Sequence, residues 1–393
     1  MNTHAEVLII GGGIAGLVAA RKLTESGVRV VLLEALNRLG GRIYTQYTAG
    51  YPVDLGAEFV HGSPNEIFEL AAEAGIPIVP VEGQFKRKIS GEWKDAGHLM
   101  ADVDKLFEQI PTDEPDQSFQ HYLDRTGAKE DVRQQALKYV EGFHAANPSL
   151  ISAYSIARDI KAEEAIHGDH QFRTSSGYEK LVQAVANRID PKLCNTVMNA
   201  AVKEIHWQQG RVTARTASAE YQAPRAIITV PLGVLKNGDV VFSPPLPEKQ
   251  NAMSFLEMGK VVRVVLCFQE KFWERDKDMK SLSFLFTDDP DFPTWWTLNP
   301  LARPVLIGWA AGHYAVALAH ASHDEVVQTA LRSLARTMNL DVHQLQTQLT
   351  GAFFHDWDAD PFFRGAYSYA AGGGIDAAHA LAAPVMKTLY FAG

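Results

Sequence analysis

The N-terminal segment combines two short apolar runs with one helical pattern, which is typical of a βαβ unit. Val7–Ile10 is uniformly apolar, as expected for a parallel strand buried on both faces. A glycine-rich turn follows, and Leu17–Ser26 has the pattern of a helix that ends at Gly27. Val28–Leu33 predicts a second strand, which ends at Glu34. These segments together span about 30 residues, the size of a dinucleotide-binding unit.

Farther along the chain the pattern changes from helical to β-rich. From about residue 63 to 187 it is mostly helical, for example over Glu66–Ala74 and Tyr178–Asn187, and Glu325–Met338 predicts a later helix. Further strands are predicted at Val202–Trp207, Arg211–Thr216, Ala226–Val230, Val261–Phe268 and Leu389–Ala392. Because the sequence has neither repeats nor a low-complexity linker, we expect two domains built from interleaved segments.

Composition narrows the class of protein. The chain has 393 residues, long enough for two domains, with 46% hydrophobic and 21% charged residues, which is typical of a soluble globular protein. A net charge of −9 argues against a nucleic-acid partner. The two cysteines, Cys194 and Cys267, have no metal or redox spacing and fit a reducing compartment. The 14 histidines also lack a metal-binding spacing, so we expect no metal site.

The sequence shows no targeting or membrane segment. The first strand begins so close to Met1 that no signal peptide fits before it. The longest apolar stretch, Val7–Ala20, contains four glycines and is shorter than the roughly 20 residues that span a bilayer. We therefore expect a cytoplasmic protein without a membrane partner.

The glycine-rich turn predicts a nucleotide site. Gly11, Gly13 and Gly16 form a G-x-G-x-x-G motif between a strand and a helix, where the backbone approaches a pyrophosphate and the helix N-terminus faces its charge. Glu34 follows about 20 residues later, where a carboxylate accepts hydrogen bonds from ribose hydroxyls and disfavours a 2′-phosphate. The motif predicts an ADP site but does not separate FAD from NAD. The alternative is a glycine turn in another kind of α/β protein.

The residues after Glu34 favour FAD. Gly40 and Gly41 allow close backbone approach, and Arg38 and Arg42 offer forked donors that suit a diphosphate. Without this context the arginines would be interpreted as solvated surface residues. Here the sequence resembles the flavin amine oxidase family, which includes monoamine, polyamine and spermine oxidases, L-amino-acid oxidases and the lysine-specific histone demethylases. In that family the Gly-Gly-Arg segment lines the FAD diphosphate.

The resemblance continues in order along almost the whole chain. Each segment is weak alone, but their shared order is a strong signal; they are 54–62, 201–205, 229–236, 244–247, Gly259–Trp273 and 357–369. The resemblance implies an α/β protein in which a Rossmann-type FAD-binding domain, of the GR2-like amine oxidase fold, is interleaved with a substrate domain of mixed sheet and helices. The expected FAD-binding domain comprises 1–75, 195–245 and 350–393, and the substrate-binding domain comprises 76–194 and 246–349.

The same resemblance implies a noncovalent FAD site. The expected contacts are Gly11, Gly13, Ile14, Ala15, Gly16, Glu34, Ala35, Arg38, Gly40, Gly41, Arg42, Gly56, Ala57, Glu58, Val202 and Gly393. Ala366 stands where monoamine oxidases carry the cysteine that attaches FAD, so the cofactor is expected to be noncovalent. The family continues beyond the position of Gly393 with a glutamate and a closing helix that helps to hold the flavin. We therefore expect a truncated chain with weakened FAD binding.

Three residues are expected at the reaction centre. Arg263 aligns with the family lysine near flavin N5; it keeps the charge but cannot act as a base. Its alternative is an arginine bonded elsewhere at a domain edge. Trp357 and Tyr367 match a tryptophan against the flavin and the first tyrosine of an aromatic cage, whose ring faces attract an amine or ammonium. Their alternative is ordinary core packing.

Two further residues bear on the substrate. The segment containing Glu58 and His61 looks closest to polyamine and spermine oxidases, in which a histidine at this point faces the substrate. Glu58 is expected to pair with a distal ammonium of a polyamine. The alternatives are a hydrogen-bonded buried histidine and a surface glutamate.

The predicted function is FAD-dependent oxidation of an amine, preferably polyamine-like. The family resemblance implies hydride transfer to flavin N5, reoxidation by O2 to give H2O2, and hydrolysis of the imine to an aldehyde. The alternatives are an FAD-dependent desaturase or protoporphyrinogen-type oxidase, or a catalytically silent flavin-fold binding protein.

Overall fold

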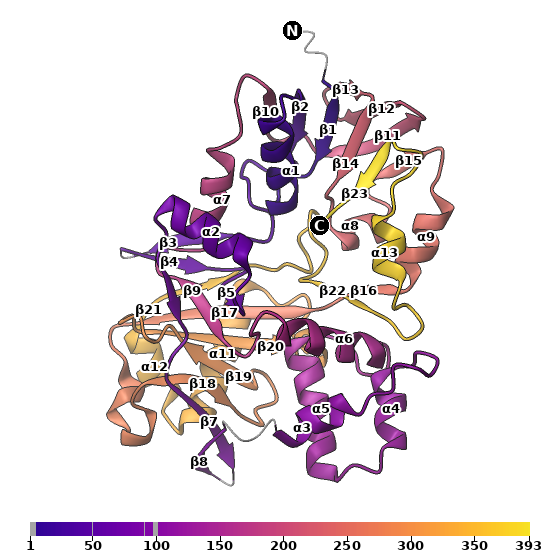
Figure 1. Ribbon diagram of the computed structural model, residues 1–393. Coiled ribbons are helices and arrows are strands. Elements are labelled where there is room, and N and C mark those ends of the chain that lie inside the picture. The colour runs from indigo at the N-terminus through magenta and orange to yellow at the C-terminus, as the bar shows by residue number, and fades with distance from the viewer. Residues whose placement is uncertain (1–4, 49, 90, 97–100) are drawn as a thin grey trace.

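The computed structural model describes residues 5–48, 50–89, 91–96 and 101–393, and it contains two main sheets built from interleaved segments (Figure 1). The first is a five-stranded parallel sheet with the order β10-β2-β1-β14-β23. In that order the strands span Cys194–Val197, Val30–Leu33, Val7–Ile10, Arg225–Ile228 and Leu389–Phe391. This sheet confirms the Rossmann-type α/β fold that the sequence predicts.

Both faces of the parallel sheet are covered, which explains its uniformly apolar strands. Ile9 packs under α1 (Ile14–Glu25), next to α2 (Asn65–Ala74) and α7 (Glu179–Ala186). Leu8 faces the opposite side and packs against a four-stranded sheet with the order β13-β12-β11-β15. Those strands span Glu220–Ala223, Arg211–Thr216, Val202–Gln208 and Val241–Ser243.

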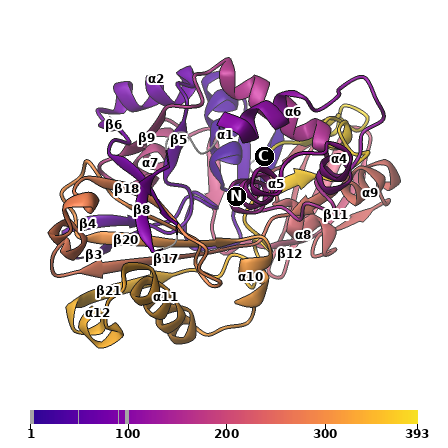
Figure 2. The same ribbon diagram turned by 90° about the horizontal axis from the view of Figure 1, so that it is seen from below.

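The second main sheet has seven strands in the order β21-β17-β20-β19-β18-β7-β8. They span Leu349–Phe354, Val261–Phe268, Val305–Ala311, Thr294–Thr297, Leu282–Phe286, Gln84–Ile89 and Glu92–Asp95. Figure 2 shows α11 (His323–Met338) and α12 (Val342–Gln348) on one face of this sheet. Val264 and Leu266 of β17 face those helices, whereas Val265 and Cys267 face Val53 and Leu55 in the interior.

Four helices form a separate apolar cluster beside the seven-stranded sheet (Figure 1). These helices are α3 (Ala101–Glu108), α4 (Phe119–Arg125), α5 (Glu130–Phe143) and α6 (Ala153–Glu164). The smaller elements connect the main layers; they are β3 (Thr45–Thr48), β4 (Tyr51–Asp54), β5 (Phe59–His61), β6 (Ile78–Pro80), β9 (Gln171–Thr174), α8 (Leu232–Lys236), α9 (Pro247–Ser254), β16 (Leu256–Met258), η1 (Phe272–Arg275), η2 (Lys277–Met279), α10 (His313–Ala317), β22 (Ser368–Ala370) and α13 (Ala377–Ala382).

The helical prediction for 63–187 missed four strands, β6 to β9. Strand β7 carries the run Lys86-Arg87-Lys88 and pairs with the short edge strand β8, and a charged strand near a sheet edge lacks the apolar alternation that marks a strand. Two segments also lie across the expected domain boundaries. Helix α7 packs on α1 of the first sheet, and β21 pairs with β17 of the second.

Candidate active site

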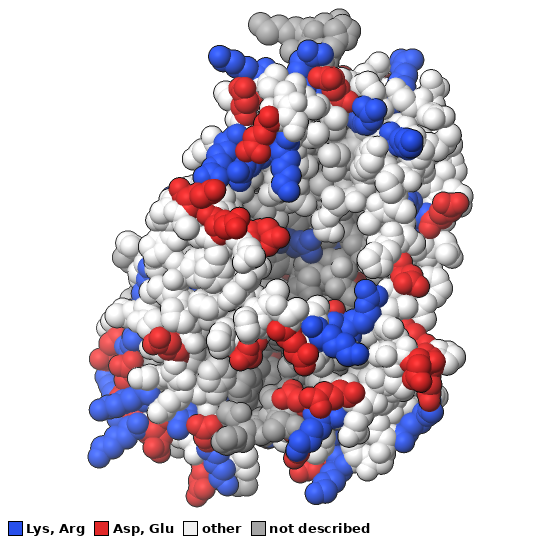
Figure 3. Space-filling model, in the orientation of Figure 1, with Lys and Arg blue, Asp and Glu red and all other residues white. Residues whose placement is uncertain are grey.

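A cavity of about 470 Å³ lies at the carboxyl ends of β1, β2 and β14. This edge of a parallel α/β sheet is where such folds bind ligands, and the volume is within the roughly 300–1,000 Å³ of cofactor and ligand pockets. The predicted cofactor residues that line it are Gly11, Gly13, Ile14, Ala15, Glu34, Ala35, Gly40, Gly41, Arg42, Ala57, Val202 and Gly393. Figure 3 shows a hollow in the middle of this face, with acidic side chains gathered over α2 at its edge.

Gly13 and Gly16 of the glycine turn each need to lack a side chain, but for different reasons. A Cβ at Gly16 would lie 2.0 Å from the carbonyl oxygen of Gly11, so only glycine lets α1 pack this closely on the turn. A Cβ at Gly13 would meet Gly41 Cα at 3.9 Å, and Gly13 borders the cavity. Helix α1 begins at Ile14 without a side-chain cap, so its first N–H groups suit an anionic diphosphate.

Glu34 is fixed in the cavity wall by the backbone. Its Oε2 accepts a hydrogen bond from Gly12 N at 2.6 Å, and its Oε1 accepts one from Leu36 N at 2.8 Å. Burial raises the pKa of Glu34, and these two hydrogen bonds together with the charge of Arg38 oppose that rise. The carboxylate is thus oriented at the position where the sequence predicts contact with a ribose.

The two arginines after Glu34 have different positions. Arg42 lines the cavity and donates from Nη1 to the carbonyl oxygen of Ala366 at 2.7 Å. Burial lowers the pKa of Arg42. Arg38 does not line the cavity; it donates to Gly41 O at 2.9 Å and lies over the Tyr44 ring at 4.3 Å. Arg38 therefore shapes the segment around Gly41, because its guanidinium donates to the carbonyl oxygens of Gly41 and Ile43.

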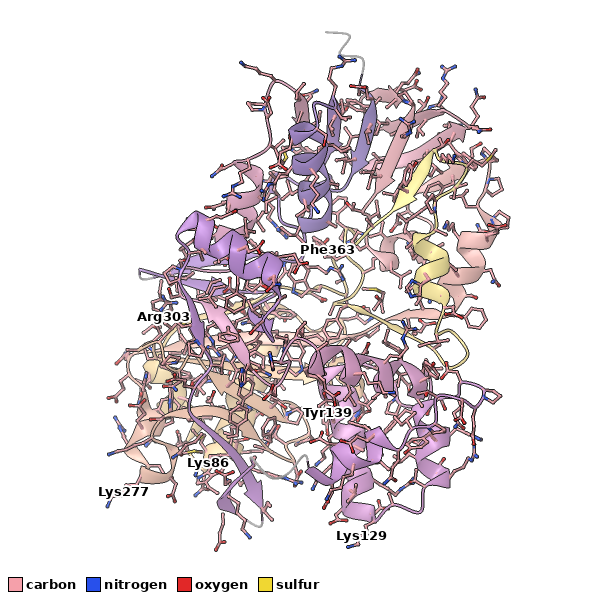
Figure 4. All side chains as sticks on the ribbon, viewed as in Figure 1. Lys86, Lys129, Tyr139, Lys277, Arg303 and Phe363 are labelled. Carbon is pink, nitrogen blue, oxygen red and sulfur yellow. The ribbon has the colours of Figure 1, made fainter. Side chains whose placement is uncertain are left out.

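Sequence reasoning missed Thr229, which lines the cavity beside the glycine turn. Its Oγ1 lies 3.0 Å from the carbonyl oxygens of both Ile10 and Gly11, to which it donates. Phe363 also lines the cavity, and Figure 4 shows it between the two main sheets. The available signal for Thr229 was its place directly after a strand of the parallel sheet, at the edge where ligands bind.

Trp357 packs against the segment that follows β4. Its Nε1 donates to Leu55 O at 3.0 Å, and its ring lies 4.8 Å from Phe363. A Cβ at Gly56 would lie 3.1 Å from the Trp357 ring and 1.9 Å from Arg42 O. Gly56 thus permits this packing and does not line the cavity, although the sequence places it among the cofactor contacts.

Tyr367 and His61 converge on the C-terminal end of α5. Tyr367 donates from its hydroxyl to Phe143 O at 2.6 Å, and burial raises its pKa. The His61 ring is edge-on to the Phe143 ring, with a centroid distance of 5.7 Å, and burial lowers its pKa. His61 is therefore neutral at neutral pH. Phe143, which the sequence did not single out, brings the two predicted residues together.

Arg263 and Glu58 form a buried ion pair between the seven-stranded sheet and the segment before β5. Arg263 lies in β17 with 4% of its surface exposed, and its Nη2 donates to Glu58 Oε2. The same oxygen accepts from Trp296 Nε1 at 3.2 Å, and Arg173 Nη1 lies 3.3 Å from Glu58 Oε1. The sequence predicts a substrate ammonium as the partner of Glu58, whereas the structure gives it two guanidinium groups.

Strand pairing explains this difference. Strands β5 and β9 pair antiparallel with Phe59 opposite Arg173, which brings the guanidinium beside Glu58. Glu58 is 5% exposed, and a buried carboxylate requires such compensation. Nothing local in the sequence around Arg173 marks it, so sequence reasoning missed it.

The part of the chain that the structure describes contains neither a candidate metal site nor a candidate membrane-spanning helix. No group of three or more His, Cys, Asp or Glu residues is arranged to hold a metal ion. No helix there combines the length and apolarity needed to cross a bilayer.

Comparison with known proteins agrees with this arrangement. The family model described as flavin containing amine oxidoreductase matches residues 14–113 and 84–393. Polyamine oxidase 4 of Oryza sativa subsp. japonica is 30% identical to the chain, covering 98% of the chain and 83% of that protein. Lysine-specific histone demethylase 2 of Homo sapiens is 26% identical over 99% of the chain and 50% of its own length.

Two solved structures share the fold. Putrescine oxidase bound to putrescine matches with a TM-score of 0.81 at 22% identity, covering 99% of this chain and 93% of that one. Cyclohexylamine oxidase from Brevibacterium oxydans IH-35A matches with a TM-score of 0.82 at 21% identity, covering 100% and 93%. The family match over most of the chain's length and the 30% identity to polyamine oxidase 4 show that the chain belongs to the flavin-containing amine oxidoreductases.

Proposed function

We propose that the chain binds FAD noncovalently in the 470 Å³ cavity and oxidises an amine, with a polyamine-like substrate preferred. The observation that carries this proposal is the Arg42–Ala366 hydrogen bond. It joins the wall of the predicted diphosphate site to the residue before Tyr367, so the cofactor cavity adjoins the aromatic residues expected to hold the amine.

FAD held by the residues that line this cavity would supply the redox chemistry, a two-electron oxidation of the carbon next to the amine nitrogen with O2 as the final acceptor, giving H2O2 and an imine that water hydrolyses to an aldehyde. The protein has to bind and orient the amine. The ring faces of Tyr367 and Phe143 attract an amine or ammonium, and neutral His61 adds no repelling charge.

Three further features bear on the proposal: the first supports noncovalent FAD, the second a polyamine substrate and the third a cytoplasmic location. Ala366 has no nucleophilic atom with which to attach FAD. The polyamine oxidases of rice and Arabidopsis match nearly the whole chain, and the related putrescine oxidase was solved with a diamine. Cys194 and Cys267 are free and buried, which fits the cytoplasmic location that we propose.

Anaerobic flavin reduction tests this function. The purified chain is loaded with FAD and freed of excess cofactor, and its absorption spectrum is recorded after addition of spermine, putrescine, cyclohexylamine or L-leucine. We expect bleaching of the flavin band, fastest with spermine, and stoichiometric H2O2 once air is admitted. An FAD-loaded chain that none of these amines bleaches contradicts amine oxidation, and a chain that takes up no FAD favours the silent binding protein.

Tyr367→Ala separates substrate binding from cofactor binding. We expect it to raise KM or lower kcat for the amine about tenfold or more while the FAD content stays at the wild-type level. Tyr47→Phe is the matched control, because Tyr47 is 55% exposed and belongs to β3, which Figure 1 shows well away from α5. Loss of FAD in Tyr367→Ala would show that this tyrosine supports the cofactor instead.

A further inference from the structure

Arg173 belongs to a buried charge cluster that the proposed function does not use. The cluster, named here the arginine pair, consists of Arg173 and Arg263 with Glu58 between them; their exposed surfaces are 1%, 4% and 5%. The three side chains come from β9, from β17 and from the residue before β5, so the cluster lies where the three-stranded sheet β5-β9-β6 meets the seven-stranded sheet. A buried ion cluster of this kind costs desolvation free energy, so its presence indicates a role beyond stability.

The hydrogen-bonding capacity of the arginine pair is incompletely used. Among the described residues, Nε and Nη2 of Arg173, Nη1 of Arg263 and Oε1 of Glu58 have no hydrogen-bond partner. All three residues line a second cavity of about 20 Å³, which is sufficient for a single water molecule. Water accepts from guanidinium N–H groups and donates to a carboxylate, so it suits this mixed set better than an anion, which Glu58 would repel.

The cluster carries an excess of positive charge. Two guanidinium groups face one carboxylate, which leaves one net positive charge in a region with little solvent. Asp54 borders the same small cavity, and its Oδ1 accepts from Tyr178 N at 3.0 Å and from Thr45 Oγ1. Arg303 also borders the cavity; it is half-buried, donates to Ser175 O at 2.8 Å, and lies toward the edge of the molecule in Figure 4.

The arginine pair adjoins the cofactor cavity. Ala57 lines that cavity, and its N donates to Arg42 O at 3.2 Å. Glu58 is the next residue in the chain, so the fixed carboxylate is one residue from the cavity wall. In a site with little water the charge acts over several ångströms with limited screening.

We propose that Arg173 is a positioning residue for the flavin site: by an ion pair and one enclosed water it fixes Glu58, which in turn fixes the Arg263 guanidinium, and the cluster keeps one net positive charge beside the cofactor. This inference rests on the FAD binding proposed above. Reduction adds negative charge to a bound flavin, so a positive neighbour raises its reduction potential. Arginine suits the role because its Nη1 donates to the Thr297 carbonyl at 3.0 Å and lies 3.3 Å from Glu58 Oε1, while Nε and Nη2 are left for the enclosed water.

The test measures the reduction potential of the bound flavin by equilibration with a reference dye, without any amine. Arg173→Gln removes one positive charge, and we expect the reduction equilibrium to shift about tenfold toward oxidised flavin, which is about 30 mV for a two-electron couple. Glu58→Gln removes the negative charge, and we expect a shift of similar size in the opposite direction. Arg173→Lys keeps the charge and should return the potential to within about threefold of the wild-type equilibrium.

The opposite signs separate this role from a purely structural one. A structural role lowers the stability of both glutamine variants but does not move their potentials in opposite directions. Arg303→Gln is the matched control, because it removes the same charge from a half-exposed site and should shift the equilibrium less than about threefold. Equal potentials in the wild type, Arg173→Gln and Glu58→Gln would overturn the proposal.

A second measurement keeps the inference testable if the glutamine variants do not fold. A crystal structure of the wild-type chain is expected to show one ordered water between Arg173, Arg263 and Glu58, and an Arg173→Lys crystal is expected to show a displaced Arg263 side chain. A dry cavity, or an unmoved Arg263, contradicts the positioning role. Failure of every amine to bleach the flavin would instead remove the proposed function while leaving these potentials and structures interpretable.

Discussion

The glycine turn lines the cofactor cavity and the arginine pair adjoins that cavity through Ala57, but the two are built on opposite principles. The turn is made of backbone, and its key positions work because Gly13 and Gly16 lack a side chain. The arginine pair is made of long charged side chains that bury one another. The first therefore depends on space and the second on charge. The difference shows that a cofactor site can be open where it must accept a ligand and closed where it must hold a charge.

The largest expected effect is a loss of stability when the carboxylate of the arginine pair is removed. Glu58→Gln leaves two buried guanidinium groups without their carboxylate, and we expect the free energy of unfolding to fall by about 3–5 kcal/mol in urea denaturation at pH 7. Glu73→Gln, which breaks an exposed ion pair with Arg188, is the control and should change the stability little. A loss below about 1 kcal/mol in Glu58→Gln would mean that charge does not hold this region together.

The second-largest effect is a pH dependence of stability, which comes from Asp54 beside the arginine pair. Burial, with a further contribution from the charge of Glu58, raises the pKa of Asp54 from 3.8 to about 6. The folded state then holds a proton that the unfolded state releases, so stability from this group is present below about pH 4 and is lost as pH rises to 6. Between pH 4 and pH 7, we expect the free energy of unfolding of Asp54→Asn to rise by up to about 3 kcal/mol relative to that of the wild type.

Denaturation curves of both proteins at several pH values provide the check. Asparagine keeps an oxygen that accepts from Thr45 and Tyr178, so the comparison isolates the ionisation. A stability difference that does not change between pH 4 and pH 7 would contradict the raised pKa.

Two glycine substitutions test why the turn needs positions without a side chain. Gly16→Ala places a methyl 2.0 Å from Gly11 O, so we expect FAD to bind at least about 100-fold more weakly, about 2.8 kcal/mol, with lower stability of the apoprotein. Gly13→Ala has its nearest neighbour at 3.9 Å and borders the cavity, so it should weaken FAD binding by a similar factor while leaving the stability of the apoprotein unchanged. Fluorescence titration with FAD and urea denaturation distinguish the two; equal loss of stability in both variants would remove the distinction.

The smallest effect concerns the support of the turn. Thr229→Val removes the hydroxyl that donates to Ile10 O and Gly11 O, and we expect a loss of about 1 kcal/mol in the free energy of unfolding. FAD affinity should fall only a few-fold, because the backbone of the turn remains. A loss of FAD as large as that of Gly13→Ala would show that Thr229 contacts the cofactor directly.

The two regions also differ in how far the sequence predicts them. The turn is contiguous, and its spacing between a strand and a helix predicts both its place and the ADP part of its ligand. The arginine pair unites residues 58, 173 and 263, which only the pairing of β5 with β9 and the packing of β17 bring together. Arg263 was found through the family resemblance, but Arg173, the second arginine on Glu58, carries no local signal. For the same reason Phe143, which joins Tyr367 to His61, was not anticipated.

The strand order has a consequence for the time course of synthesis. Strand β14 pairs on one edge with β1, which precedes it, and on the other with β23, which begins at Leu389. At roughly 5–20 residues per second the ribosome needs on the order of 10–30 s to pass from β14 to β23. During that interval the outer edge of β14 is an unpaired strand open to other nascent chains. The Rossmann sheet is therefore completed only as β23 leaves the ribosome, and slower initiation or lower temperature should raise the soluble yield of this protein.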